Sequence, residues 1–127
     1  MRAALGYARR AGRLGEVPVG CVITRGGEIV SYGYNRRERD KNALRHAEII
    51  AIDRACRRLG GWRLWECELF ATLEPCPMCA GAILNSRVRA VYYGARDQKA
   101  GALGGVFNLF DYPLNHKPVV VGGVLEE

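Results

Sequence analysis

Apolar residues recur at helical spacing in two stretches of the chain. Residues 2–13 place leucine and alanine three or four positions apart with arginines between them, and this spacing predicts an amphipathic helix. Residues 46–59 repeat the pattern with isoleucine, alanine and leucine, and Gly60 and Gly61 then end the segment, as glycine commonly does after a helix. We therefore expect one helix at the start of the chain and a second in its middle.

Short apolar runs between turn residues predict the strands. Residues 19–24 and 29–32 are separated by a segment with two adjacent glycines, which is typical of a β-hairpin. The polar segment that follows, residues 35–45, predicts a loop. Three further apolar runs predict strands at 68–73, 88–93 and 118–121.

Proline locates a third helix. Pro75 and Pro77 flank Cys76, and proline is tolerated in the first turn of a helix but not in its interior. We therefore predict a helix from Cys76 to about Ser86. A glycine-rich loop and then a short helix at 107–110 are expected before the last strand.

Strands that alternate with helices along 127 residues predict one α/β sandwich domain, 1–127, with a largely mixed sheet. The hydrophobic fraction of 49% and the charged fraction of 25% exclude a disordered, collagen-like or coiled-coil chain. No apolar run approaches the length of a membrane span, and the first residues lack the apolar core of a signal peptide. We expect a soluble, cytoplasmic protein with no membrane partner.

Basic residues are concentrated in the first half of the chain. The chain has 19 Lys and Arg against 13 Asp and Glu, and residues 1–63 hold 14 of the basic and 6 of the acidic side chains. Nearly all of the basic residues are arginine, which binds phosphate with two hydrogen bonds and stacks on bases. This favours a polyanionic partner such as nucleic acid, although a solvated basic face would have the same composition.

Two short motifs carry candidate chemistry, His46-Ala47-Glu48 and Pro75-Cys76-Pro77-Met78-Cys79. The five cysteines are an odd set, a reducing compartment disfavours disulfides, and only Cys76 and Cys79 cluster. A Cys-x-x-Cys pair at the start of a helix occurs in zinc sites and in redox sites, and two inert core cysteines are the third interpretation. With His46 the pair provides three zinc ligands and leaves a fourth position for water.

The spacing of His46 and Glu48 restricts how both can reach one metal ion. Residues two apart point about 200° apart around a helix, so they share a site only at the helix end. There, Glu48 would take a proton from a zinc-bound water and deliver it to a leaving amine, which is hydrolytic deamination. His-x-Glu combined with Pro-Cys-x-x-Cys is a known zinc deaminase signature. Taken singly, Glu48 is also an ordinary first-turn carboxylate and His46 a polar helix cap.

Longer blocks of the sequence match one family pattern. They are Glu16-Val17-Pro18-Val19-Gly20, Asn35, His46-Ala47-Glu48-Ile49, the run from Thr72 to Ile83, Ser86-Arg87 and Tyr93-Gly94-Ala95-Arg96-Asp97. Together these blocks resemble the bacterial tRNA-specific adenosine deaminases over nearly the whole chain. The Thr-Leu-Glu-Pro-Cys and Gly-Ala-Arg-Asp segments are the most specific part of the resemblance.

The resemblance implies a cytidine-deaminase-like fold, which is a three-layer α/β/α sandwich with a mixed central sheet of about five strands. It also implies a homodimer with one Zn²⁺ per subunit. The implied reaction converts the wobble adenosine of a tRNA anticodon stem-loop to inosine, by attack of zinc-bound hydroxide on C6.

The site residues that the resemblance implies fall into two groups. The zinc ligands would be His46, Cys76 and Cys79, with Glu48 as the proton shuttle. The substrate contacts would be Asn35 to the flipped base, Val19, Ala47 and Leu73 around its pocket, and Asp97 and Arg96 near the ribose of the target nucleotide or its neighbour. Without the family, Asn35 reads as a left-handed turn residue at a strand end and Asp97 as a solvated loop acid.

The sequence departs from the family pattern in three places. The family usually continues into a C-terminal amphipathic helix, whereas this sequence stops at Val124-Leu125-Glu126-Glu127, so we expect that helix to be missing and apolar sheet surface to be exposed. Arg45 directly precedes His46, and we expect it to contact phosphate or to alter substrate choice. Cys21 replaces the usual alanine, and we interpret it as a small buried hydrophobe.

Other functions would use the same residues. A small-molecule deaminase for guanine, cytosine or a free nucleoside would share the zinc chemistry, but a free base needs no arginine-rich surface. A pocket for a base flipped out of an RNA loop also suits single-stranded DNA, which is a further candidate partner. A redox or structural zinc module would leave Glu48 unexplained.

Overall fold

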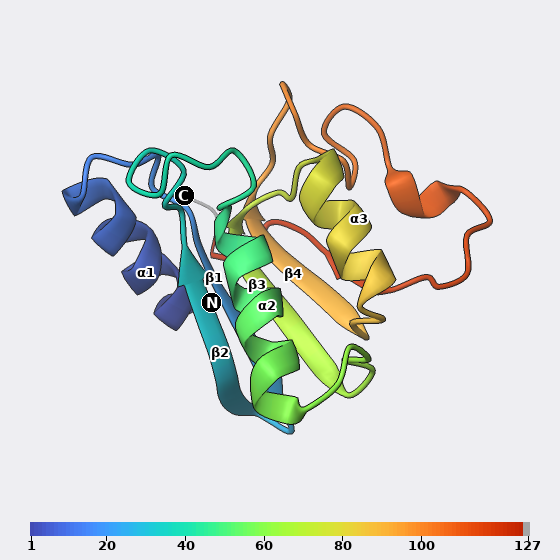
Figure 1. Cartoon of the computed structure of the whole chain (residues 1–127). Helices are drawn as coiled ribbons and strands as arrows, with labels where there is room; N and C mark the ends of the chain where they lie inside the picture. Colours follow the sequence, from blue (N-terminus) through green and yellow to red (C-terminus); the bar gives the residue numbers. More distant parts are fainter. Residues whose placement is uncertain (126–127) are drawn as a thin grey trace.

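A five-stranded mixed sheet forms the centre of the molecule in the computed structural model, which describes residues 1–125 (Figure 1). The strands are β1 Gly20–Arg25, β2 Glu28–Tyr34, β3 Cys67–Leu73, β4 Ala90–Ala95 and β5 Val119–Val121. Their order in the sheet is β2-β1-β3-β4-β5. β1 runs antiparallel to β2 and to β3, whereas β3, β4 and β5 run parallel. The predicted mixed sheet of five strands is therefore confirmed.

Helices cover both faces of this sheet. They are α1 Arg2–Arg13, α2 Ala47–Leu59, α3 Pro77–Asn85 and the short 3-10 helix η1 Leu109–Asp111. α2 and α3 lie side by side on one face, and α1 packs on the opposite face against β1 and β2 (Figure 1). The expected α/β/α layering is confirmed. Within residues 1–125, no helix has the length and apolarity needed to cross a membrane.

Two glycines allow the helices to approach the sheet closely. A Cβ atom on Gly20 in β1 would collide with the backbone of Ala4 and Ala8 in α1. A Cβ atom on Gly33 in β2 would collide with the carbonyl of Ala47 in α2. Because alternate residues of a strand point to opposite faces, small residues on both faces of this hairpin fix the positions of both helical layers.

The main core lies between the sheet and the layer formed by α2 and α3. Complete burial of a large aliphatic side chain contributes about 1.5–3 kcal/mol, so this layer is a major source of stability. Its largest fully buried side chains are Ile23, Leu64, Leu69, Ile83, Val88 and Val91.

Predicted and observed boundaries differ by a few residues. β4 begins at Ala90, two residues later than predicted, because Arg87 adopts a left-handed backbone conformation with φ 63° and the strand then follows the register of β3. The short helix predicted at 107–110 is η1, which begins two residues later because the side chain of Asn108 accepts a hydrogen bond from the N–H of Phe110.

One part of the sheet surface remains open among the described residues. Phe70 and Tyr92 stack on the face of β3 and β4 opposite α3, with ring centroids 4.8 Å apart. On the neighbouring β5, Val119 and Val121 are 58% and 41% exposed. Apolar sheet surface is thus exposed, as expected. We expected no further helix at the C-terminal segment of residues 124–127. Its last two residues, 126–127, lie outside the described residues.

Candidate active site

The carboxyl ends of β2, β3 and β4 meet at one edge of the sheet, because these three strands run in the same direction. Asn35, Glu74 and Arg96 follow directly after these strands. α2 and α3 begin at the same edge, with His46 and Cys76 as their N-caps (Figure 1). The topology therefore brings residues from distant parts of the sequence to one place, the usual position of a ligand site in an α/β sheet.

His46, Cys76 and Cys79 form a group that fits a metal ion. The Nδ1 atom of His46 lies 3.7 Å from the Sγ atom of Cys76 and 3.6 Å from that of Cys79. All three ligand atoms lie within 4.8 Å of one another. Nitrogen and sulfur ligands of a tetrahedral zinc ion are about 3.5 Å apart, so the group matches zinc.

Hydrogen bonding divides the protons unequally between the two thiols. The pKa of Cys76 is lowered to about 5, mainly because the Cys79 thiol donates a hydrogen bond to it. The backbone N–H groups of Cys79 and Met78 make smaller contributions in the same direction. The hydrogen bond between the two thiols, together with burial, raises the pKa of Cys79. The lowered pKa favours the thiolate form of Cys76, which is the form that binds a metal ion.

Glu48 lies next to this group without belonging to it. Its side chain is buried, and burial raises the pKa of its carboxyl group to about 7, with a further contribution from the negative charge of Cys76. His46 keeps an extended backbone at the helix end (φ −75°, ψ 155°), so both side chains face one site although they are two residues apart. A carboxyl group near neutrality is well suited to proton exchange with a reacting water.

An open cavity of about 160 Å³ connects these groups to solvent. His46, Cys76 and Glu48 lie in its wall. The other residues that line it are Val17, Val19, Asn35, Arg37, Ala47, Leu73, Glu74, Asp97 and Ala100. Apolar side chains and a few polar and charged groups thus meet at one cavity, which is typical of a ligand site.

Comparison with known proteins identifies the family. The family model of the cytidine and deoxycytidylate deaminase zinc-binding region matches residues 1–95. A tRNA-specific adenosine deaminase of Bacillus subtilis (strain 168) is 48% identical over 128 residues, which covers 100% of this chain and 80% of that protein. This chain belongs to the tRNA-specific adenosine deaminase family. It is a zinc-dependent hydrolytic deaminase.

Solved structures support the same conclusion. A structure from studies of A-to-I editing by tRNA:A34 deaminases at the wobble position of transfer RNA matches with a TM-score of 0.92 and 44% identity, over 97% of this chain and 95% of that chain. A guanine deaminase from Bacillus subtilis matches with a TM-score of 0.73 and 30% identity, over 90% of this chain and 83% of that chain. The cytidine-deaminase-like fold of the deaminase is thereby confirmed.

The structure places most of the expected substrate contacts at the cavity. Val19, Asn35, Ala47, Leu73 and Asp97 all line it. The exception is the arginine before Asp97. Arg96 is exposed, its guanidinium lies beside Gly104, and it is not among the lining residues.

Asn35 stabilises the start of the loop that follows β2. Its side-chain oxygen accepts a hydrogen bond from the N–H of Arg37 at 3.1 Å, and its amide group donates to the carbonyl of Val17 at 3.3 Å. The φ angle of Asn35 is not positive, so the left-handed turn interpretation is wrong. A carboxamide has two N–H donors, so one remains for a group in the cavity.

Four lining residues were missed by the sequence analysis, namely Val17, Arg37, Glu74 and Ala100. Arg37 stands two positions after Asn35, and Glu74 stands two positions before Cys76. Besides this closeness, Glu74 and Val17 lie in blocks that match the family pattern, which was a further signal. Val17 and Ala100 are small apolar loop residues whose types indicate no function.

Arg45 has a structural partner in the deaminase. We expected it to contact phosphate or to alter substrate choice, but its Nε atom donates to Asp40 at 2.9 Å, and Asp40 also binds Arg36 at 3.1 Å. Hydrogen bonds from Arg36 and Arg45 lower the pKa of Asp40. Cys21, in contrast, is fully buried in β1, as expected of a small apolar side chain.

Proposed function

We propose that this deaminase converts the wobble adenosine of a tRNA anticodon to inosine. The observation that carries the proposal is one open cavity that combines the His46, Cys76 and Cys79 group, the buried Glu48 and, at its wall, the exposed Arg37. The match to a tRNA:A34 deaminase over nearly all of both chains supports this choice of substrate.

The reaction consumes water and adenosine and gives inosine and ammonia. His46, Cys76 and Cys79 would hold zinc, which when bound lowers the pKa of a water molecule toward 7 and makes it a nucleophile for C6 of adenine. Glu48 accepts the proton that this nucleophile gives up. The same carboxyl group then delivers the proton to the amino group, which leaves as ammonia.

The remaining cavity residues would bind the flipped nucleotide. Val19, Ala47 and Leu73 present apolar surface to the base, and the free amide N–H of Asn35 donates to a ring nitrogen. Asp97 accepts a hydrogen bond from a ribose hydroxyl. Arg96 contacts the RNA outside the cavity.

The arginines near the cavity differ in their availability to RNA. Arg36 and Arg45 are paired with Asp40. Arg37 and Arg39 are exposed, and among residues 1–125 neither forms an ion pair. These two side chains are therefore our candidates for phosphate contacts in an anticodon stem-loop.

Two further features belong to the same proposal. By analogy with the family pattern, the enzyme acts as a cytoplasmic homodimer. Single-stranded DNA is a second substrate, because a cavity that receives a base flipped out of an RNA loop is open to one from a DNA strand. Size-exclusion chromatography with light scattering tests the dimer, and an adenosine-containing DNA hairpin tests the substrate.

The guanine deaminase match favours free guanine as the rival substrate. The test measures kcat/KM of the zinc-loaded enzyme for an anticodon stem-loop with adenosine at the wobble position, for free adenosine and for free guanine. We expect the stem-loop to exceed both small molecules by at least about a hundredfold, which corresponds to a few additional RNA contacts. A higher kcat/KM for guanine would contradict the proposal.

A further inference from the structure

Two loops flank the cavity on either side of β1 and β3. One follows β2 and carries Asn35 and Arg37, and the other follows β4 and carries Asp97 and Ala100 (Figure 1). Neither loop belongs to a helix or strand, so its backbone must be held by other contacts if it is to present these side chains to a substrate.

The loop after β4 is held by the buried carboxylate of Glu74. This side chain is 2% exposed and lies directly after β3. Its Oε1 atom accepts a hydrogen bond from the N–H of Asp97 at 3.0 Å. Its Oε2 atom accepts from the N–H groups of Leu103 and Gly105, both at 2.8 Å. Three backbone donors from one loop thus compensate for the burial of one negative charge.

Packing around this carboxylate leaves no space for larger residues. A Cβ atom on Gly105 would lie 2.7 Å from Oε1 of Glu74, and one on Gly101 would collide with the same carboxylate. The next residue, Pro75, accepts a hydrogen bond from the N–H of Ala102 at 2.9 Å. The loop is therefore wrapped around the segment that leads directly into the metal-ligand group.

We propose that Glu74 is a positioning residue, whose carboxylate fixes the loop of residues 97–105 so that Asp97 faces the substrate. The catalytic consequence rests on the proposed function, in which Asp97 contacts the nucleotide. The anchoring itself rests only on the three N–H contacts, the burial and the two glycines.

Glu16 provides a matched control at the other loop. It is 5% exposed, and its carboxylate accepts hydrogen bonds from the N–H groups of Glu38 at 3.1 Å and Arg39 at 2.8 Å. The two buried carboxylates therefore perform the same task on separate cavity walls. If the loss of a buried negative charge were itself the cause of a defect, substitution of either glutamate would cause the same defect. If positioning is the cause, each substitution affects only the loop that its glutamate holds.

The first test is amide hydrogen exchange by NMR in Glu74→Gln. Glutamine keeps the size of the side chain but replaces one acceptor oxygen with an NH₂ group, which cannot accept from a backbone N–H. Exchange at Asp97, Leu103 and Gly105 is expected to rise by at least about tenfold. Exchange at Glu38 and Arg39 is expected to stay unchanged in this variant and to rise in Glu16→Gln.

The second test is a double-mutant cycle on kcat/KM for the anticodon stem-loop. Asp97→Asn removes the charge but keeps the side-chain oxygen that accepts from the N–H groups of Lys99 and Ala100. If Glu74 acts through Asp97, Glu74→Gln lowers kcat/KM by about tenfold, mainly through KM, and has little further effect in Asp97→Asn. In the double variant with Glu16→Gln, by contrast, the two factors by which kcat/KM falls should multiply, because the two glutamates hold different loops.

Gly105→Ala disturbs the same contact from the loop side and serves if Glu74→Gln does not fold. Gly81→Ala is its control, because a Cβ atom there meets nothing within 4 Å. Unchanged exchange at Asp97, Leu103 and Gly105, full multiplication of the Glu74 and Asp97 effects, or loss of zinc from Glu74→Gln would each overturn the proposal. Failure of the wild-type enzyme to deaminate the stem-loop would contradict the proposed function alone, since exchange still decides the anchoring by Glu74.

Discussion

Position at the end of a helix decides the roles of the metal-site residues. His46 and Cys76 are the N-caps of α2 and α3, so their backbones are extended and their side chains can point along the helix ends toward each other. Glu48 lies in the first turn of α2 and is buried beside them, and burial raises the pKa of its carboxyl group to about 7. If His46 and Glu48 lay in the middle of a helix, their side chains would point about 200° apart and could not reach one metal ion.

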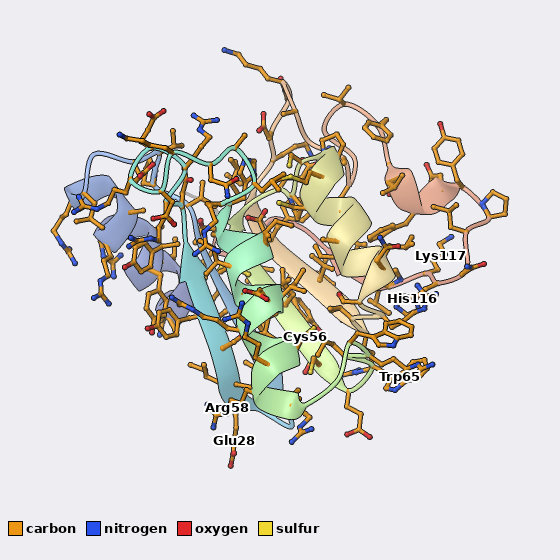
Figure 2. The ribbon with its side chains drawn as sticks, in the orientation of Figure 1. Glu28, Cys56, Arg58, Trp65, His116 and Lys117 are labelled. Atoms are coloured by element: carbon orange, nitrogen blue, oxygen red, sulfur yellow. The ribbon has the colours of Figure 1, made fainter. Side chains whose placement is uncertain are left out.

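The two histidines of the chain offer a matched comparison at this scale. His46→Ala removes one of three ligands, and we expect stoichiometric zinc and deamination to be lost together. His116→Ala should retain both, because His116 bonds to the carbonyl of Val88 at 2.7 Å and lies away from the start of α2 (Figure 2). Metal analysis of the purified variants measures this. Full zinc content in His46→Ala would show that the ligand assignment is wrong.

Single residues could be predicted where their chemistry is local in sequence. The histidine and cysteine motifs identify a metal group because ligand type and spacing are both visible. Glu74 could not be assigned, because its partners stand 23 to 31 positions later and are backbone groups of no particular residue type. The ion pair of Arg45 with Asp40 could not be predicted either, because it depends on how the loop folds.

At the scale of elements, close contact between helix and strand positions the start of α2. Gly33 lies where a side chain would collide with the carbonyl of Ala47, the first residue of that helix. Any displacement of α2 at this point moves His46 and Glu48 relative to the cysteines on α3. The geometry of the metal group therefore depends on a glycine that has no chemistry of its own.

Gly33→Ala tests this dependence. The added methyl group should lower the free energy of unfolding by about 1–3 kcal/mol, the usual cost of overpacking, and should weaken zinc binding. Gly61→Ala is the control, since no atom lies within 4 Å of a Cβ there and its φ is not positive. Urea unfolding of both variants gives the comparison. A Gly33→Ala protein as stable as Gly61→Ala would contradict the packing argument.

The hydrophobic periodicity of the sequence predicted the helices and strands, but it did not predict the residues at which they begin and end. The 3.6-residue and two-residue patterns are set by burial of one face, which the sequence displays directly. The start of β4 at Ala90 depends on pairing with β3 and on the left-handed conformation of Arg87. Neither feature leaves a local pattern in the residues concerned.

At the scale of the whole molecule, strand order creates the cavity. The sequence predicts a mixed sheet, but only the order β2-β1-β3-β4-β5 brings the loops after β2 and β4 to the two sides of the metal group. Arginines therefore differ in their distance from the cavity. Arg37 lies at the cavity wall, whereas Arg58 lies in the last turn of α2, at the end of the helix away from the cavity (Figure 2).

Salt dependence distinguishes these two arginines. Arg37→Ala should reduce the slope of log kcat/KM against log salt concentration by about 0.7–0.9 for the stem-loop, the effect of one lost phosphate contact. Arg58→Ala should leave the slope unchanged, because its guanidinium donates to the carbonyl of Val30 far from the cavity. Equal slopes for wild type and Arg37→Ala would exclude Arg37 from phosphate binding.

The most direct test of the account measures inosine formation and zinc content together in the wild-type enzyme and in Glu48→Gln. The substrate is the anticodon stem-loop with adenosine at the wobble position. We expect one zinc ion per chain in both proteins, conversion by the wild type and a loss of at least about a thousandfold in kcat for Glu48→Gln, because all ligands remain while the proton carrier is gone. Substantial conversion by zinc-loaded Glu48→Gln would contradict the assigned chemistry.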